Sequence, residues 1–167
     1  MADWVIERLR PDHDRSGFSC GQAPLDAFLA TLVSQYEKRR LGRTYVATES
    51  GQKRVAGYYT LAAGSLDASS LPTASYKHLP KHPIPTIHPG RLAVDSAFQG
   101  KGLGETLLFD ALQRALELSE KLGAFGVDLW AIDEQAGAFY QKYGFLALDD
   151  PLHLFVPMKT VAKLFQG

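Results

Sequence analysis

The sequence has little cysteine and no long apolar run. Cys20 is the only cysteine among 167 residues, which excludes an intramolecular disulfide and a cysteine-based metal site. No stretch approaches the roughly 18 consecutive apolar residues that a membrane-spanning helix needs. The start of the chain also lacks a basic region followed by an apolar run, the pattern of a secretory signal. We therefore expect a cytoplasmic protein with no membrane association.

Net charge is also absent, because 18 basic residues balance 18 acidic ones. The overall field of the protein cannot attract a polyanion, so any contact with nucleic acid must come from a local patch. The densest basic cluster is Lys38, Arg39 and Arg40, with Arg43 just past Gly42. The sequence leaves two interpretations open, namely cations that complement the negative end of a helix dipole and a surface that faces nucleic acid.

Length and composition indicate one domain, residues 1–167, since 46% hydrophobic and 22% charged residues are ordinary for a globular protein of this size. The second half alternates strands and helices, so part of the sheet should be parallel and covered by helices. The predicted fold class is α/β (α+β). Predicted strands cover residues 4–9, 43–48, 55–62, 91–94, 125–132 and 152–157, and predicted helices cover 24–42, 103–122, 134–142 and 159–165.

Residues 65–89 carry five prolines and three histidines, which predicts an extended loop with at most a short helical turn. His78 and His82 have the spacing of one helix face, but Pro80 lies between them and no local carboxylate or cysteine completes a ligand set. We therefore expect no metal site, and we interpret these residues and His88 as loop histidines along a substrate path.

The most informative stretch begins with the apolar residues Leu92, Ala93 and Val94 and continues through Gln99 to Gly104 into a predicted helix. Glycines at 100, 102 and 104 let a ligand approach the backbone amides closely. The start of the helix adds N–H donors and a partial positive charge. This arrangement predicts a cradle for a phosphate-bearing cofactor.

Three glycine motifs compete for this stretch. A P-loop needs Ser or Thr after its lysine, but Gly102 follows Lys101. A dinucleotide fingerprint would need a third glycine where Leu107 stands. The third motif, Gln-x-x-Gly-x-Gly, is fulfilled by Gln99 to Gly104, and with it the sequence resembles the GNAT superfamily of N-acetyltransferases. Residues 133–145 also look like a second motif of that superfamily, its final helix and the Tyr-Gly-Phe that follows the helix.

The GNAT resemblance implies a mixed, partly parallel, twisted sheet of about six to seven strands flanked by helices, with acetyl-coenzyme A as cofactor. It implies that the backbone around Leu92 binds the pantetheine arm and polarises the thioester carbonyl, while the glycine loop holds the pyrophosphate. The implied cofactor-binding residues are Leu92, Ala93, Val94, Gln99, Gly100, Lys101, Gly102, Leu103, Gly104 and Phe139.

A closer resemblance covers most of the chain. The stretches 18–21, 25–29, 43–46, 57–61 and 90–95 look like the GNAT toxins of bacterial toxin–antitoxin modules. Those toxins acetylate the free amino group of the amino acid on charged tRNA, and a ribbon-helix-helix antitoxin silences them. The resemblance therefore implies aminoacyl-tRNA and such an antitoxin as partners, and it leaves a homodimer open. The implied tRNA-binding residues are Lys38, Arg39, Arg40, Arg43 and Arg91.

The same resemblance implies that Tyr140 is the general acid that protonates the departing thiolate. Tyr143 is the rival phenol, three residues on and on the same predicted helix face. An α-amino group has a pKa of about 8, so a strong general base is not demanded. Cys20 has no histidine adjacent in sequence and reads as a small buried residue.

Two other functions fit part of these motifs. A GNAT enzyme acting on a small amine or a protein N-terminus would need the same loop and the same Tyr140. A non-catalytic module that binds coenzyme A, or that engages an antitoxin on DNA, would need the loop alone.

Overall fold

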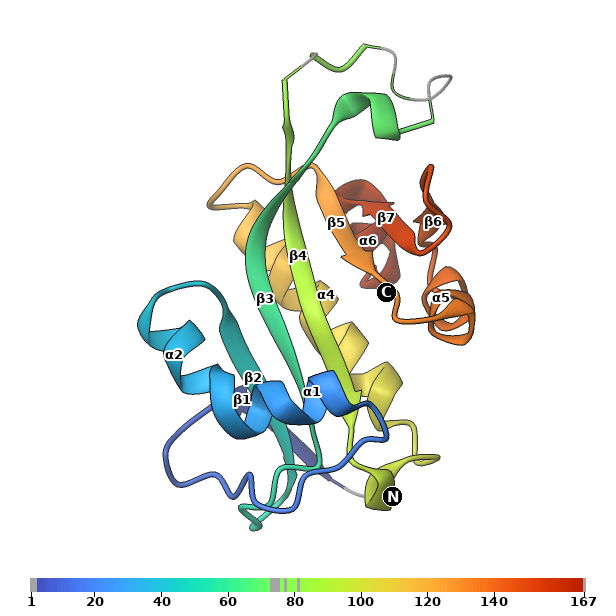
Figure 1. Ribbon diagram of the computed structural model, residues 1–167. Coiled ribbons are helices and arrows are strands. Elements are labelled where there is room, and N and C mark those ends of the chain that lie inside the picture. Colours follow the sequence, from blue (N-terminus) through green and yellow to red (C-terminus); the bar gives the residue numbers. More distant parts are fainter. Residues whose placement is uncertain (1–2, 73–75, 77, 81, 167) are drawn as a thin grey trace. The chain divides into compact units, whose positions relative to one another are not determined.

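The structure, a computed structural model, describes residues 3–72, 76, 78–80 and 82–166. These residues contain a seven-stranded sheet in the order β1-β2-β3-β4-β5-β7-β6 (Figure 1). β4 and β5 pair in parallel, whereas β1–β2, β2–β3, β5–β7 and β6–β7 are antiparallel. The predicted mixed, partly parallel sheet is confirmed. The strands are β1 (Trp4–Arg8), β2 (Arg43–Glu49), β3 (Gly57–Leu66), β4 (Ile84–Val94), β5 (Gly126–Trp130), β6 (Leu146–Ala147) and β7 (His153–Pro157).

Backbone proximity divides the chain into two compact units. The first unit contains Met1–Ala62 and Pro89–Ala111, and the second contains Ala63–His88 and Leu112–Gly167. None of the described helices is both long and apolar enough to cross a membrane. The helices are α1 (Ala23–Ala27), the π-helical η1 (Phe28–Leu32), α2 (Val33–Lys38), the 3-10 turns η2 (Ala68–Ser70) and η3 (Ser96–Phe98), α4 (Leu103–Ser119), α5 (Glu134–Gln141) and α6 (Met158–Leu164).

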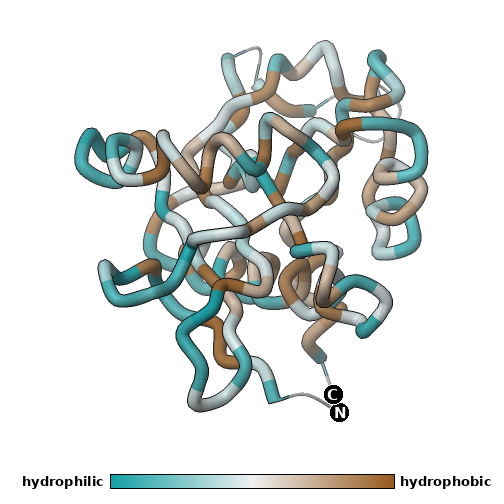
Figure 2. Tube along the Cα trace, turned by 60° about the horizontal axis from the view of Figure 1, so that its bottom comes forward, coloured by the Kyte–Doolittle hydropathy of each residue, from teal (hydrophilic) through white to brown (hydrophobic). Residues whose placement is uncertain are grey.

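In the first unit, α1, η1 and α2 form the continuous amphipathic segment that the sequence predicts, with Pro24 in its first turn. Figure 2 shows hydrophobic residues recurring between hydrophilic ones along the helical turns. Phe28, Leu29 and Val33 are buried and share one core cluster with residues of β2, β3 and β4. Burial of this apolar face stabilises the segment against the sheet.

The end of this segment differs from the prediction that placed it at Gly42. The helix ends at Lys38, and Arg40 adopts a left-handed backbone with φ of 60°. The N–H of Leu41 donates to the carbonyl of Tyr36 at 2.9 Å, and that of Arg40 donates to Glu37 at 3.2 Å. This pair of bonds is a Schellman motif, in which the left-handed residue is usually glycine. Here an arginine occupies that position.

In the second unit, a core cluster joins β3, β4 and β7 through Leu66, Ile84 and Phe155. Both ends of α5, the helix predicted at 134–142, are defined by local interactions. The side chain of Asp133 accepts a hydrogen bond from the N–H of Ala136 at 2.8 Å, and Gly144 follows the helix with φ of 96°. These caps fix where α5 begins and where the chain leaves it.

The predicted loop at 65–89 is wrong at both ends, because β3 continues to Leu66 and β4 begins at Ile84. Strand β4 tolerates Pro85 although proline has no backbone N–H. The residue takes part through its carbonyl, which accepts a hydrogen bond from the N–H of Phe125 at 2.8 Å. His88 is consequently a strand residue. Strand β6 was not predicted, and residues 73–75, 77 and 81 of the predicted loop lie outside the described residues.

We predict that Gly126→Ala destabilises the protein by about 1–3 kcal/mol, the usual cost of overpacking a core. A Cβ at Gly126 would lie 2.5 Å from Cε1 of Phe155 and 2.5 Å from the carbonyl oxygen of Val156. Gly123→Ala is the matched control, because a Cβ there meets nothing within 4 Å. Urea unfolding followed by circular dichroism measures both variants. Equal unfolding midpoints would contradict the packing argument.

Candidate functional site

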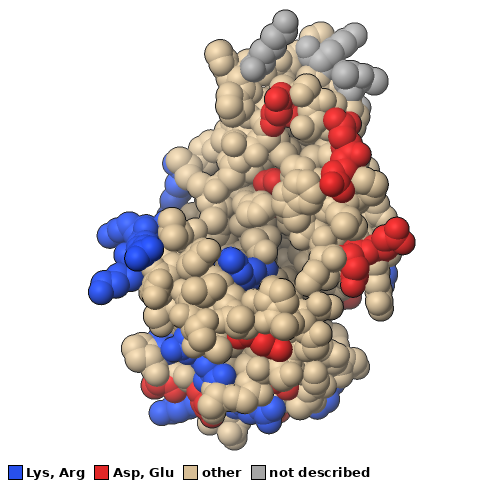
Figure 3. All heavy atoms as spheres, viewed as in Figure 1, with Lys and Arg blue, Asp and Glu red and all other residues tan. Residues whose placement is uncertain are grey.

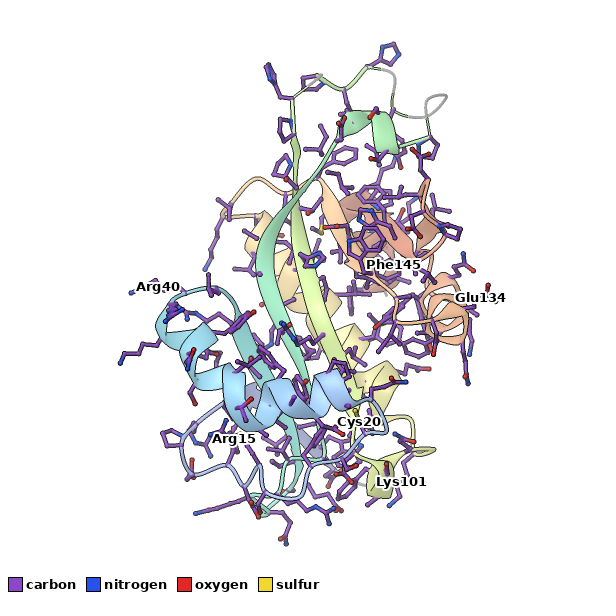
Figure 4. The ribbon with its side chains drawn as sticks, in the orientation of Figure 1. Arg15, Cys20, Arg40, Lys101, Glu134 and Phe145 are labelled. Carbon is purple, nitrogen blue, oxygen red and sulfur yellow. The ribbon has the colours of Figure 1, made fainter. Side chains whose placement is uncertain are left out.

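The turn between β4 and α4 has the strand–glycine turn–helix form that the sequence predicts. After η3, Gly100 and Gly102 both adopt φ of 79°, a region that other residues rarely occupy. A Cβ at either glycine would meet nothing within 4 Å, so the space above these amides is open to a ligand. Lys101, between them, is exposed and lies in the turn shown in Figure 4.

The helix after this turn supplies the other half of an anion site. α4 begins at Leu103, and its first backbone hydrogen bond runs from the N–H of Thr106 to the carbonyl of Gly102 at 3.1 Å. The amides at the start of such a helix point out of its end, where the helix dipole favours negative charge. Together with the positive-φ glycines and Lys101, this turn has the donors that a phosphate group requires.

Gln99 has a structural task at this turn. Its side-chain amide donates to the carbonyl of Val94 at 2.9 Å and to the carbonyl of Cys20 at 3.1 Å. The residue therefore ties the turn to the end of β4 and to the segment that precedes α1. Its predicted contact with a cofactor stays a prediction.

Asp95, which the sequence analysis did not assign to the site, anchors the same turn. Its buried carboxylate accepts hydrogen bonds from the N–H groups of Ser19 at 3.0 Å and Ala97 at 2.9 Å. The guanidinium of Arg54 lies 3.4 Å from it. The sequence does contain a feature that could have indicated this role, because Asp95 is a charged residue directly after the apolar strand that ends at Val94.

The strand residues predicted to bind the cofactor lie at the end of β4. The recorded β4–β5 register comprises Thr86 with Gly126 and Ile87 with Val127. Leu92, Ala93 and Val94 lie beyond that register on β4, and the side chain of Ala93 belongs to the core of the first unit. The backbone of this part of β4 is therefore outside the β4–β5 ladder.

Tyr140 lies on α5 in the second unit, packed edge-to-face against Phe139 and Phe145 at centroid distances of 5.2 and 5.6 Å. Burial raises the pKa of Tyr140 to about 12, so its hydroxyl stays protonated at neutral pH. No hydrogen bond of this hydroxyl is present among the described residues. The phenol can therefore donate its proton to an incoming group.

Tyr143 follows α5, which ends at Gln141. Tyr143 lies in the turn that follows, where its N–H donates to the carbonyl of Tyr140 at 3.0 Å and its ring contacts Phe139 at 5.4 Å. Both phenol rings pack against Phe139, so the choice of Tyr140 over Tyr143 stays a prediction.

Cys20 has the environment of a structural thiol. Burial, together with the neighbouring Asp26, raises its pKa to about 11, so the reactive thiolate is scarce at neutral pH. Its N–H donates to the carboxylate of Asp26 at 2.8 Å. The interpretation of Cys20 as a non-nucleophilic residue is supported, but the residue is half-buried and not buried as predicted.

The basic residues at the end of α2 divide into two groups. Lys38, Arg39 and Arg40 are exposed, and Figure 3 shows basic side chains protruding from this end of the helix. Arg40 is at its outer tip in Figure 4. Arg43, by contrast, donates to the backbone carbonyl of Glu37 at 3.0 Å and pairs with the Glu37 carboxylate at 3.1 Å. To bind RNA phosphates as predicted, Arg43 would have to give up part of its contact with Glu37.

Arg91 is held by aromatic rings of the first unit. Its guanidinium carbon lies 3.7 Å from the ring centroid of Phe28 and 5.1 Å from that of Tyr36. Such cation–π contacts fix the side chain in place while leaving its charge intact. Arg91 is half-buried, in keeping with a positioned cation rather than a mobile surface one.

A polar cluster in the second unit was not predicted. Asp128 on β5 is buried, and Thr86, His88 and His153 surround its carboxylate. Burial acts to raise the pKa of Asp128, but hydrogen bonds from His88, Thr86 and His153 outweigh it and the pKa lies below its ordinary value. His78 and His82, the other histidines of the predicted substrate path, are exposed.

Comparison with known proteins gives one family and several relatives. Residues 40–146 match the family model described as an acetyltransferase (GNAT) domain. The chain is 34% identical over 158 residues to a tRNA-acetylating toxin of Mycobacterium tuberculosis, covering 94% of this chain and 93% of that protein. It is 32% identical to a probable toxin TacT of Sinorhizobium fredii, covering 96% of this chain and 94% of that protein.

Solved structures give the same result. A mutant of KacT matches with a TM-score of 0.92 and 31% identity over 97% of this chain and 99% of that one. AtaT complexed with acetyl-methionyl-tRNAfMet matches with a TM-score of 0.90 and 32% identity over 98% and 100% of the two chains. An AtaT mutant bound to acetyl-CoA and the C-terminus of the antitoxin AtaR has a TM-score of 0.82 and 31% identity, covering 98% of each chain.

We predict that Gln99→Ala lowers the free energy of unfolding by about 1 kcal/mol, because the carbonyls of Val94 and Cys20 lose a common donor. Gln135→Ala on α5 is the control, since Gln135 is exposed and a substitution at such a surface position changes stability by less than about 0.5 kcal/mol. Urea titration of both variants measures the difference. Indistinguishable losses would mean that Gln99 does not hold the turn.

Proposed function

This chain belongs to the GNAT acetyltransferase family, and we propose that it transfers acetyl from acetyl-coenzyme A to the free amino group of the amino acid on charged tRNA. The observation that carries the substrate is the 34% identity to a tRNA-acetylating toxin over 94% of this chain. An acetylated amino group cannot form a peptide bond, so the product blocks translation and the protein acts as a toxin.

Acetyl-coenzyme A supplies the acetyl group as an activated thioester. The turn from Gln99 to Gly104 holds its pyrophosphate through the backbone amides at the start of α4, with Lys101 adding a positive charge. The backbone of β4 around Leu92, Ala93 and Val94 binds the pantetheine arm, and Phe139 contributes an apolar contact. The positive φ and open space at Gly100 and Gly102 support this assignment.

Tyr140 is the general acid for the departing thiolate. Its raised pKa keeps the proton on the phenol across the physiological range, and its packing between Phe139 and Phe145 restricts the ring. The α-amino group of an aminoacyl ester has a pKa of about 8, so an appreciable neutral fraction is present near pH 7. The neutral amino group can therefore attack the thioester without first being deprotonated by a strong base.

The exposed cations Lys38, Arg39 and Arg40 bind the phosphates of the tRNA, with Arg43 and Arg91 nearer the reacting end. Such contacts release counterions and carry no sequence information, so binding should weaken as salt rises. The left-handed backbone of Arg40 supports a functional reason for a cation there, because a glycine would satisfy the same motif with less strain.

Partners and location follow from this activity. A ribbon-helix-helix antitoxin masks the toxin, as supported by the AtaT structure with the C-terminus of AtaR. Residues 1–167 act as one acetyltransferase domain. The protein works in the cytoplasm, where charged tRNA is found.

The proposed function is tested with purified protein, labelled acetyl-coenzyme A and total charged tRNA. We expect label on the aminoacyl group and release of the free thiol of coenzyme A. Tyr140→Phe should lower the rate of thiol release by about 100-fold or more, the usual contribution of general acid catalysis. Label on small amines or protein N-termini with none on RNA would refute the tRNA assignment.

Tyr143→Phe is the matched control, since it removes the neighbouring hydroxyl and should leave the rate within a few-fold of wild type. An acid must be protonated to act, and the pKa of Tyr140 is about 12. Activity should therefore show no alkaline decline between pH 7 and pH 10. A decline in that window that disappears in Tyr140→Phe would contradict the raised pKa.

We further predict that Arg40→Gly stabilises the protein by about 1 kcal/mol, because a left-handed backbone is costly for a side-chain-bearing residue. The same change should weaken tRNA binding and reduce its salt dependence by about one counterion. Arg39→Gly removes an equal charge at φ of −85°, so it should weaken binding without any gain in stability. Unchanged tRNA affinity in Arg40→Gly would remove this residue from the RNA surface.

A further inference from the structure

The buried carboxylate of Asp128 is contacted by side chains from two neighbouring strands. Its Oδ1 accepts a hydrogen bond from the hydroxyl of Thr86 at 2.6 Å and lies 3.4 Å from Nδ1 of His88, both on β4. Its Oδ2 lies 2.9 Å from Nε2 of His153 on β7. The whole Asp128 residue, backbone included, is 3% exposed. One carboxylate thus connects two imidazoles inside the second unit.

Neighbouring residues make room for this cluster and hold it in place. A Cβ at Gly64 on β3 would lie 2.8 Å from the Thr86 hydroxyl and 3.0 Å from Cβ of His88, so a larger residue there would displace both. The indole of Trp130 stacks on the imidazole of His153 with centroids 4.2 Å apart and an interplanar angle of 12°. The titratable groups that face Asp128 are His88 from β4 and His153 from β7, while β3 contributes the glycine.

Exposure differs among the three titratable members. The side chain of His88 is 29% exposed, compared with 15% for His153 and 5% for Asp128. His88 is therefore the most solvent-accessible member of the cluster. His153, stacked under the Trp130 ring, completes the support of the carboxylate.

The pairing of a carboxylate with a more exposed imidazole has a known chemical use. When Nδ1–H of His88 donates to Asp128, the lone pair is on Nε2, and the carboxylate stabilises the imidazolium that forms when Nε2 takes a proton. Low polarity around Asp128 strengthens this stabilisation. The cluster is therefore built to accept one proton and to release it again.

We propose that His88, oriented by Asp128, accepts the proton that leaves the attacking amino group during acetyl transfer. This inference rests on the proposed function. It follows from the cluster geometry and from the position of His88 on β4, four residues before Leu92 on the strand whose backbone is assigned to the pantetheine arm. His88 is then a catalytic residue, and Asp128 is a positioning residue that acts through it.

With His88 as the base and Tyr140 as the acid, every bond and proton in the acetyl transfer is accounted for. The amine nitrogen forms a bond to the acetyl carbon and the carbon–sulfur bond breaks. The amine proton goes to Nε2 of His88, and the sulfur takes the proton of Tyr140. The imidazolium then gives its proton to solvent and the phenolate regains one, so the products are an amide and a free thiol.

The test measures kcat for acetylation of charged tRNA between pH 5 and pH 9. His88→Gln should lower kcat by about 100-fold and abolish the rise of kcat with pH that titration of His88 produces. Asp128→Asn should lower kcat by a smaller factor and move that rise to lower pH, because the imidazolium loses its anionic partner. Gln113→Ala, a change at an exposed position of α4, should leave both quantities unchanged.

A wild-type pH profile in His88→Gln, with kcat within three-fold, would overturn the inference while leaving the proposed function intact. A wild-type protein that acetylates no charged tRNA would instead remove the proposed function. NMR titration of the histidine ring protons separates the two cases without any substrate. The midpoint for His88 should move to lower pH in Asp128→Asn, and an unchanged midpoint would overturn the pairing.

Discussion

The glycine turn depends on the buried carboxylate of Asp95. It binds the N–H of Ala97 inside the turn and the N–H of Ser19 from a distant segment, while Gln99 adds a second tie through the carbonyl of Cys20. The glycines only permit the conformation of the turn, whereas these hydrogen bonds select it. The stretch around Cys20, which contains the family's N-terminal signature, is thereby part of the turn's own support, and this gives a physical reason for its presence.

Asp95 and Asp128 are both 3% exposed, yet their partners give them different behaviour. Asp95 is held by backbone amides, which do not titrate, and by the always-charged Arg54. Asp128 is held by two imidazoles, side chains that can gain or lose a proton. The first carboxylate is therefore suited to fixing a loop at every physiological pH. The second is suited to exchanging a proton.

The sequence predicted the features that depend on local patterns. The amphipathic segment at Pro24, the cap at Asp133 and the turn at Gly100 all follow from spacing and backbone preference, and the structure contains each of them. The extent of β4 could not be predicted, because Pro85 reads as a breaker unless the partner strand is known to use only its carbonyl. The Asp128 cluster could not be predicted for a similar reason. Its members come from positions far apart in the chain, and the registers of β4 with β5 and of β5 with β7 bring them together.

The pKa of Tyr140 restricts how the two proton transfers can be arranged. A phenol with a pKa of about 12 is a weaker acid than a thiol, whose pKa is about 8.5. Transfer of the Tyr140 proton to the departing thiolate is therefore uphill and is drawn forward when the phenolate regains a proton. Its phenolate then recovers a proton at once from solvent. Since Tyr140 is always protonated before reaction, the pH dependence of the rate must come from the amine and the group that receives its proton. A titrating imidazole paired with a buried carboxylate meets that requirement, whereas a second tyrosine would not.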